Sequence, residues 1–286
     1  MAGNCQSASG TKVIIKKLKM TNSNQICPVL FIPHGGGPLP LLGEESHLAL
    51  VSFLKEITLS LPLPSSILII SAHWEEDKVT ITNVKRPSLI YDYYGFPKEM
   101  YQIKYPAPGD TVLANKIYKL FQDSGIEAKL DEQRGFDHGM FIPLKIMFPE
   151  ANIPCVQVSL LKNLDPESHI KIGKALSKLR NENTLIIGSG FTFHNMKALM
   201  SQNADVDSKN EKFEQWLIDT CTNPNYSPSM KEQKLIDWSK APFARYCQPR
   251  EEHLLPLHVC VGAAFSNAKL VFEGKVSGKK TSAFLW

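Results

Sequence analysis

Short apolar runs alternate with longer amphipathic patterns along most of the chain. A run of about four to eight apolar residues between turn residues is typical of a buried strand, whereas apolar positions three and four residues apart are typical of an amphipathic helix. Buried strands are predicted at 28–33, 66–72, 155–160 and 184–188. Helices are predicted at 46–60, 110–124, 165–180, 207–221 and 252–265. This order predicts one α/β domain, with a central mixed, mostly parallel sheet flanked by helices on both faces.

The segments between these elements predict further strands and one long loop. Residues 79–82 alternate between apolar and polar side chains, as in a strand, and residues 269–273 and 281–285 predict two strands around a Gly-Lys-Lys turn. Residues 223–250 are predicted to be irregular. Residues 86–110 hold four prolines and five tyrosines. A loop of this length inside a compact domain usually has a function.

Composition narrows the class of protein. Residues 1–27 are polar, weakly basic and free of a contiguous apolar segment, so we expect a flexible N-terminal extension there and no secretory signal. The single domain is expected over 28–286. The chain is 43% apolar and 21% charged, with a net charge of +4. The apolar and charged fractions are typical of a soluble globular enzyme, and the mild, dispersed net charge gives no sign of nucleic-acid binding.

The cysteines and the apolar runs indicate the compartment. Six cysteines are spread along the chain without a CxxC pair, which favours reduced thiols over a disulfide framework. Cys155 and Cys260 lie in apolar stretches and are expected to be small core residues. No apolar run approaches the roughly 18 residues of a membrane span. We therefore expect a cytoplasmic protein that binds no membrane and is a monomer or a small homo-oligomer.

Histidines follow three of the predicted strands. His34, His73 and His194 each come at or just after a strand end, the first and last in glycine-containing turns. Open α/β sheets bind ligands outside the carboxyl ends of their strands, and imidazole is a common ligand of zinc, iron and copper. Each residue alone is also compatible with a simpler role, in a turn or, for His73, against Trp74 at the edge of the core. Repetition at independent strand ends favours a shared metal site.

A fourth histidine opens the last predicted helix. His253 and His258 are five residues apart, about 500° around a helix, so at most one of them is expected to enter a shared site. Glu252 is compatible with three roles: a metal ligand, a hydrogen-bond partner that holds a ligand in place, or a solvated residue of a first helical turn.

The remaining histidines and motifs carry less information. His138 follows Asp137 in a glycine-flanked loop and is compatible with an acid/base role or with a turn. His47 and His169 lie on polar-patterned helices and are predicted to face solvent. The chain has no GxGxxG after a strand, no phosphate-binding loop, no HExxH and no GxSxG. A serine hydrolase is therefore disfavoured.

Several blocks in order resemble one known family, the LigB superfamily of extradiol ring-cleaving dioxygenases, in its DOPA-dioxygenase branch. The resemblance extends from about residue 28 to 285, nearly the whole chain. The matching blocks are HGGGP at 34–38, SAHW at 71–74, YDYYGFP at 91–97, YPAPG at 105–109, GFDHG at 135–139, HN at 194–195 and REEHLLPLHV at 250–259. Several blocks in the same order are far more specific than any one of them.

The resemblance implies a metal-dependent oxygenase site. It assigns His34, His73 and His253 as metal ligands, places His194 at the metal as a ligand or an acid/base residue, and places His138 in the substrate site. Fe(II) is expected for catalysis, with Zn(II) as the alternative. Better-known members of the superfamily use two histidines and one carboxylate, whereas here His253 stands where a carboxylate is expected.

The implied reaction is cleavage of a catechol ring by O2 beside the diol. A DOPA-like substrate and 4,5-type cleavage to a muconic semialdehyde are expected. The tyrosine-rich loop, including Tyr94, is predicted to wall the substrate site, and Arg245 or Arg250 to pair with a substrate carboxylate. Two alternatives stay open: a zinc-dependent hydrolase or other non-oxygenase on the same fold, and a non-catalytic binding protein.

Overall fold

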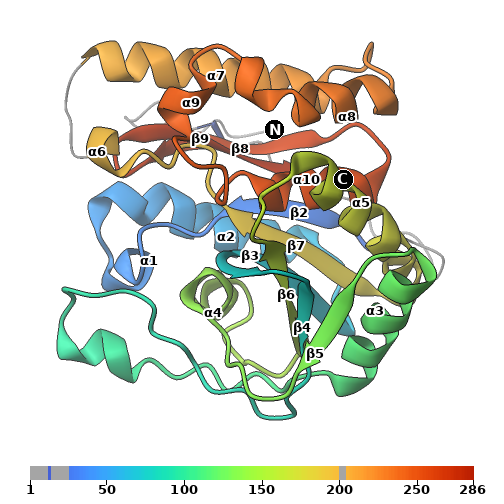
Figure 1. Cartoon of the computed structure of the whole chain (residues 1–286). Helices are drawn as coiled ribbons and strands as arrows, with labels where there is room; N and C mark the ends of the chain where they lie inside the picture. The colour runs from blue at the N-terminus through green and yellow to red at the C-terminus, as the bar shows by residue number, and fades with distance from the viewer. Residues whose placement is uncertain (1–11, 14–25, 200–203) are drawn as a thin grey trace, which may run out of the picture.

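The computed structural model describes residues 12–13, 26–199 and 204–286. Within these residues the strands form one sheet (Figure 1). The strands are β1 (Lys12–Val13), β2 (Val29–Pro33), β3 (Ser66–Glu76), β4 (Val79–Thr82), β5 (Ala128–Asp131), β6 (Cys155–Leu161), β7 (Thr184–Gly190), β8 (Lys269–Val276) and β9 (Lys279–Leu285). Their order across the sheet is β1-β8-β9-β2-β7-β3-β6-β4-β5.

The centre of the sheet is parallel and its two sides are mixed. Strands β2, β7, β3 and β6 pair in parallel, which confirms the predicted parallel core. The β8–β9 hairpin joins β2 in antiparallel fashion, and β4 pairs antiparallel with β6 but parallel with β5. All five residues of β2 and all seven of β7 are buried, as expected for strands covered on both faces.

The helices occupy the connections between the strands. The α-helices are α1 (Leu39–Leu42), α2 (Leu48–Ser60), α3 (Thr111–Asp123), α4 (His138–Met147), α5 (Pro166–Leu176), α6 (Met196–Leu199), α7 (Ala204–Thr222), α8 (Pro228–Ile236), α9 (Ala244–Cys247) and α10 (Leu255–Ala264). Short 3-10 turns are η1 (Glu45–His47), η2 (Lys98–Gln102), η3 (Ser177–Glu182) and η4 (Trp238–Lys240).

Helices cover both faces of the sheet, as predicted. Helix α4 packs against β3 and β7, and α10 packs against β2, β3 and β7. Successive residues of a strand point to opposite faces. Ser189 of β7 contacts Gly139 of α4, whereas a Cβ on the preceding Gly188 would lie 2.5 Å from the Cys260 sulfur of α10. The two helices therefore lie on opposite faces, and glycine at 188 lets α10 approach the strand closely.

Two interpretations of the sequence are wrong. His47 and His169 were predicted to face solvent, but both are fully buried. His47 Nε2 accepts a hydrogen bond from the Gly36 backbone N–H, and His169 Nε2 accepts one from that of Leu161. Each imidazole thus satisfies a backbone donor of the preceding loop or strand, outside its own helix, which the helical pattern could not reveal.

The segment at 223–250 is also not irregular, because it contains α8, η4 and α9. Helix α8 begins with Pro228 after Ser227, whose hydroxyl accepts a hydrogen bond from the Met230 N–H. Helix α4 and strand β5 were not predicted at all. Helix α4 is apolar nearly all round and contains Pro143, so no amphipathic period marks it.

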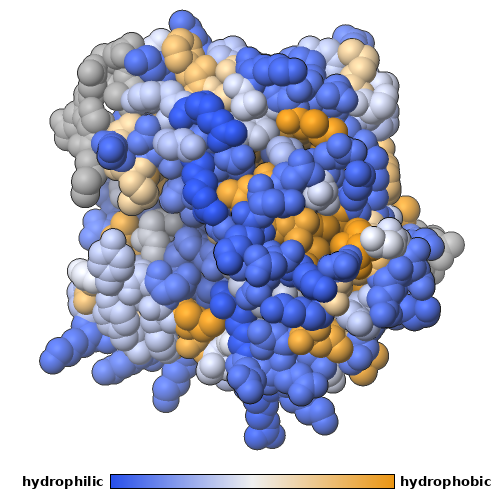
Figure 2. Space-filling view, viewed as in Figure 1, coloured by the Kyte–Doolittle hydropathy of each residue, from blue (hydrophilic) through white to orange (hydrophobic). Residues whose placement is uncertain are grey.

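Most of the predicted N-terminal extension lies outside the described residues. Its Lys12–Val13 segment pairs with β8, and the boundary at residue 28 stays a prediction. Cysteines 27, 155, 221, 247 and 260 are free and buried, as the composition indicated. In the described part of the chain, no helix is long and apolar enough to cross a membrane. Hydrophilic residues predominate on the face in Figure 2, and they separate the hydrophobic patches from one another.

Candidate metal centre and active site

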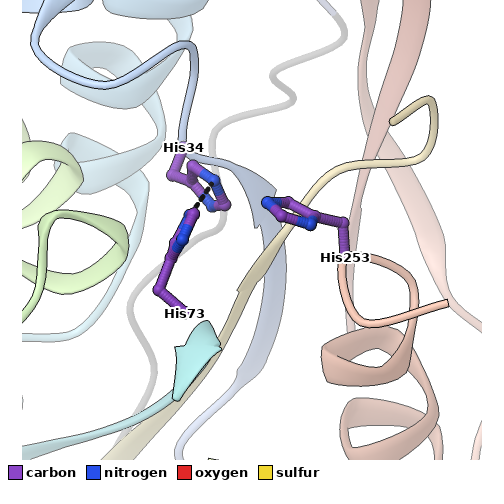
Figure 3. A group of neighbouring side chains, drawn as sticks. All are labelled: His34, His73 and His253. Atoms are coloured by element: carbon purple, nitrogen blue, oxygen red, sulfur yellow. Dashed lines mark hydrogen bonds between the residues drawn. The ribbon is translucent and has the colours of Figure 1, made fainter. Parts of the chain in front are cut away.

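Three of the predicted ligands meet at the carboxyl ends of the central strands. His34 follows β2, His73 lies in the last part of β3, and His253 lies in the turn before α10. Their ligand atoms lie within 4.8 Å of one another. The Nε2 atoms of His34 and His73 are 3.0 Å apart, and the His253 ring points toward them (Figure 3).

The strand ends explain why these residues converge. Pairing of β2 with β7 ends at Pro33 and Gly190, directly before His34. Pairing of β3 with β7 ends at Ser71, so His73 lies in the part of β3 that no longer pairs with β7. Parallel strands end at one edge of the sheet, and this edge is the ligand-binding side of open α/β folds.

Oxygen atoms orient the three imidazoles through their Nδ1 atoms. His253 Nδ1 lies 3.0 Å from Glu252 Oε1, and His73 Nδ1 lies 3.6 Å from Asp92 Oδ2. His34 Nδ1 lies 3.2 Å from Ser189 Oγ.

At His34 and His253 the nitrogen is the donor, whereas the 3.6 Å contact of His73 with Asp92 is longer than a hydrogen bond. The Ser189 hydroxyl donates its proton to the Gly139 carbonyl, so its oxygen accepts from His34, and ionised carboxylates only accept. The proton therefore sits on Nδ1 in His34 and His253, and the Nε2 lone pairs of these two rings are available to a metal ion.

Burial keeps these imidazoles neutral. Desolvation lowers the pKa of His34 and of His253 well below 6.5, and neighbouring histidines lower it further. The same two causes lower the pKa of His73 to about 3. A histidine must be neutral to bind a metal ion, and these three histidines are already neutral near pH 7.

His194 lies against this group. Its ring stacks on the ring of His253, with centroids 3.3 Å apart and planes 18° from parallel. Its Nδ1 lies 3.1 Å from the same Glu252 oxygen that His253 uses. Its backbone N–H donates to the Cys247 carbonyl, which fixes the segment after β7. His194 is thus positioned to act at the metal or beside it.

His138 completes the cluster at the start of α4. Its ring centroid lies 3.9 Å from that of His73 and 5.5 Å from that of His34. Asp92 Oδ1 accepts from both the backbone N–H and Nδ1 of His138, at 3.0 and 2.8 Å. Tyr93, from the long loop, places its ring 5.7 Å from that of His138. The five histidines of the family pattern therefore form one continuous group.

The three predicted substrate-binding residues lie elsewhere or are already paired. Tyr94 is 92% exposed, whereas Tyr93 beside it is buried. Arg245 pairs with Glu251 and covers the Trp238 ring.

Arg250 is held by two carboxylates. Its Nη1 and Nη2 atoms lie 2.6 and 2.5 Å from the two oxygens of Glu75, and Nη1 lies 3.4 Å from Glu252 Oε2. A substrate role for Tyr94, Arg245 and Arg250 stays a prediction.

Sequence reasoning missed Asp92, Ser189 and Tyr93. Asp92 and Tyr93 stand inside the block YDYYGFP at 91–97, so the resemblance contained their signal without distinguishing them from their neighbours. Ser189 stands between two glycines of β7, without the GxSxG spacing of a nucleophile, so the sequence assigned it no role. Its role as the acceptor for His34 depends on α4 packing across the sheet, which no local pattern reveals.

Comparisons with known proteins identify the family of the chain. Residues 31–283 match the family model described as the catalytic LigB subunit of aromatic ring-opening dioxygenase. The chain belongs to the LigB family. It is an aromatic ring-opening dioxygenase of the extradiol type, as the resemblance implied. The family implies a small-molecule substrate and O2, and the histidine cluster is able to hold a metal ion.

Individual relatives match over most of their length. The chain is 39% identical to the dioxygenase tasH of Hapsidospora irregularis over 86% of this chain and 80% of that protein. It is 38% identical to a 4,5-DOPA dioxygenase extradiol of Beta vulgaris over 87% of this chain and 91% of that protein. A crystal structure of an uncharacterized Escherichia coli K12 protein superposes with a TM-score of 0.71 at 25% identity, covering 91% of this chain and 99% of that one.

Proposed function

We propose that this LigB-family enzyme opens the ring of a catechol, with a DOPA-like compound as its substrate. Cleavage of the 4,5 type inserts both atoms of O2 and yields a muconic semialdehyde that can cyclise. The observation that carries the proposal is the convergence of three neutral imidazoles on one point with His194 stacked beside them. Relatives named 4,5-DOPA dioxygenase extradiol, among them that of Beta vulgaris, support this substrate class.

The donor set fits a single divalent metal ion. His34, His73 and His253 would hold it through Nε2, with His194 next to it. We expect Fe(II) in the active enzyme, although Zn(II) suits the same neutral nitrogens. When bound, the ion supplies a common centre that holds the catechol and O2 in reacting orientation.

We assign the proton transfers to His194. Its Nδ1 donates to Glu252, which leaves Nε2 as the basic atom. Nε2 would take a proton from a catechol hydroxyl and return one as the O–O bond breaks. An imidazole suits both steps because its unperturbed pKa is about 6.5.

We assign substrate orientation to the opposite side of the cluster. His138 is anchored by Asp92 through two hydrogen bonds, so its Nε2 is free to contact a substrate oxygen. The Tyr93 ring lies beside His138, and its hydroxyl donates to the Met100 carbonyl. Its aromatic face is therefore held by the loop and is suited to contact the substrate ring.

Anaerobic reconstitution tests the proposal. Metal-free protein is loaded with Fe(II), mixed with L-DOPA without oxygen and then exposed to air, and a yellow chromophore is the expected result. Protein loaded with Zn(II) is the control and is expected to remain colourless. No absorbance change with a panel of catechols contradicts the proposal. Turnover by the Zn(II) form without oxygen favours the hydrolase alternative.

A further inference from the structure

One carboxylate oxygen is shared by the two stacked histidines. Glu252 Oε1 lies 3.0 Å from His253 Nδ1 and 3.1 Å from His194 Nδ1, and the Glu252 side chain is 12% exposed. A carboxylate has no proton to give, so both nitrogens donate. The two rings are nearly parallel and share this acceptor, so both present their Nδ1 atoms to Glu252.

The second oxygen of Glu252 faces a fixed positive charge. Arg250 Nη1 lies 3.4 Å from Oε2, and the same guanidinium makes two short contacts with Glu75. Glu75 belongs to β3 and is in register with Leu160 of β6. The ion pairs that join Glu75, Arg250 and Glu252 are therefore attached to the sheet. Arg250 is thus an ion-pair partner of Glu252 on the side of the sheet, and Oε2 accepts no hydrogen bond from the described residues.

We propose that Glu252 is a positioning residue that holds His253 and His194 in one tautomer and orientation without binding the metal itself. This inference rests on the proposed function only in taking His253 as a ligand and His194 as the acid/base residue. Glu252, His194 and His253 also have ligand atoms within 4.8 Å of one another. A metal ion at Oε1 would have to displace two N–H donors that this oxygen already accepts, so the orienting role fits the geometry better.

Metal binding by the purified full-length chain tests the inference without substrate or oxygen. Co(II) affinity is measured by titration of the metal-free protein against a competing chelator, and the visible spectrum reports the ligand set. Glu252→Leu removes the acceptor, and Glu252→Gln keeps an acceptor oxygen without the charge. Glu251→Gln is the matched control, because the neighbouring carboxylate pairs with Arg245. Thermal melting of each metal-free variant checks folding.

The expected result is a graded loss of affinity with an unchanged spectrum. Loss of a hydrogen-bond partner of a metal-binding histidine typically weakens binding about 10- to 100-fold, which is the effect expected for Glu252→Leu. Glu252→Gln is expected to weaken binding about fivefold, since a neutral acceptor is weaker than a charged one. Glu251→Gln is expected to leave affinity within about twofold, a change small on the scale of one hydrogen bond.

Two outcomes overturn the inference. Equal Co(II) affinity of Glu252→Gln and Glu251→Gln contradicts an orienting role. This comparison remains decisive even when Glu252→Leu fails to fold. A changed cobalt spectrum in Glu252→Gln identifies Glu252 as a ligand instead. Neither outcome depends on turnover, so absence of ring cleavage with normal Co(II) binding is a failure of the proposed function alone.

Discussion

The imidazole rings of His194 and His253 lie in face-to-face contact, with centroids 3.3 Å apart. Burial, and then the neighbouring His194, lower the pKa of His253 far below 6.5, so a proton in this pair is disfavoured on His253. The His194 side chain is 25% exposed, whereas that of His253 is 5% exposed. These differences fit the roles proposed above, with His253 as a neutral ligand and His194 as the acid/base residue.

Replacement of His194 by Phe is expected to abolish proton transfer while preserving the ring stack. The expected turnover is about 10²- to 10⁴-fold lower, the usual contribution of one acid/base residue. Affinity for Co(II) is expected to remain within about threefold, because His34, His73 and His253 keep their donors. Steady-state rates with L-DOPA and chelator competition measure the two effects. Unchanged ring cleavage contradicts the acid/base role, and a parallel loss of metal makes His194 a ligand.

We expect Asp92 to orient His73 in the way that Glu252 orients His253. Asp92→Asn replaces the carboxylate 3.6 Å from His73 Nδ1 by a neutral amide, so the negative charge that faces this ring is lost. Co(II) affinity is expected to fall about tenfold, a typical effect for a partner of a metal-binding histidine. The control is Asp77→Asn, a surface carboxylate paired with Lys162. Equal affinity of the two variants would show that Asp92 does not support His73.

Gly190 is expected to be irreplaceable at the end of β7. A Cβ at this position would lie 2.2 Å from the backbone oxygen of His253, which also accepts the Phe191 N–H. Gly190→Ala must therefore move the segment that carries His253, and we expect a loss of about 1–3 kcal/mol in the free energy of unfolding. Urea unfolding of the metal-free protein measures it. A loss below about 0.5 kcal/mol, the usual range for neutral surface changes, contradicts the expectation.

The clustering of the histidines was predictable because most of them lie at or just after strand ends. His34, His73 and His194 each stand where an apolar run stops, and the edge of a parallel sheet brings such positions together. His253 stands beyond the strands, before α10, so its assignment depended on the family resemblance.

The features that the sequence did not predict depend on contacts between separate segments of the chain. The burial of His47 depends on the backbone of Gly36, and the orientation of His34 depends on a serine whose proton goes to α4. Such partners have no fixed spacing in sequence. Helix α8 differs, because Ser227 and Pro228 carried a recognisable start signal that the polar segment around them obscured.

A fully buried carboxylic acid outside the metal site, Glu214, is expected to make the stability depend on pH. Glu214 of α7 is fully buried, its Oε2 accepts a hydrogen bond from Ser282, and its Oε1 has no hydrogen-bond partner among the described residues. Burial raises the pKa of Glu214 from 4.5 to about 7. The folded chain therefore favours the protonated acid, which adds stability below pH 4.5 that is lost as the pH rises through 7.

Glu214→Gln is expected to remove this dependence. A neutral amide imitates the protonated acid, so at pH 8 the variant should exceed the wild type by about 3 kcal/mol in the free energy of unfolding, and below pH 4.5 the two should agree. The buried histidines change stability with pH in the opposite sense, but they are common to both proteins and cancel in the difference. Glu211→Gln, at an exposed position of the same helix, is the control. A difference between wild type and Glu214→Gln that stays constant from pH 4 to 8 would show that Glu214 keeps its ordinary pKa in the folded chain.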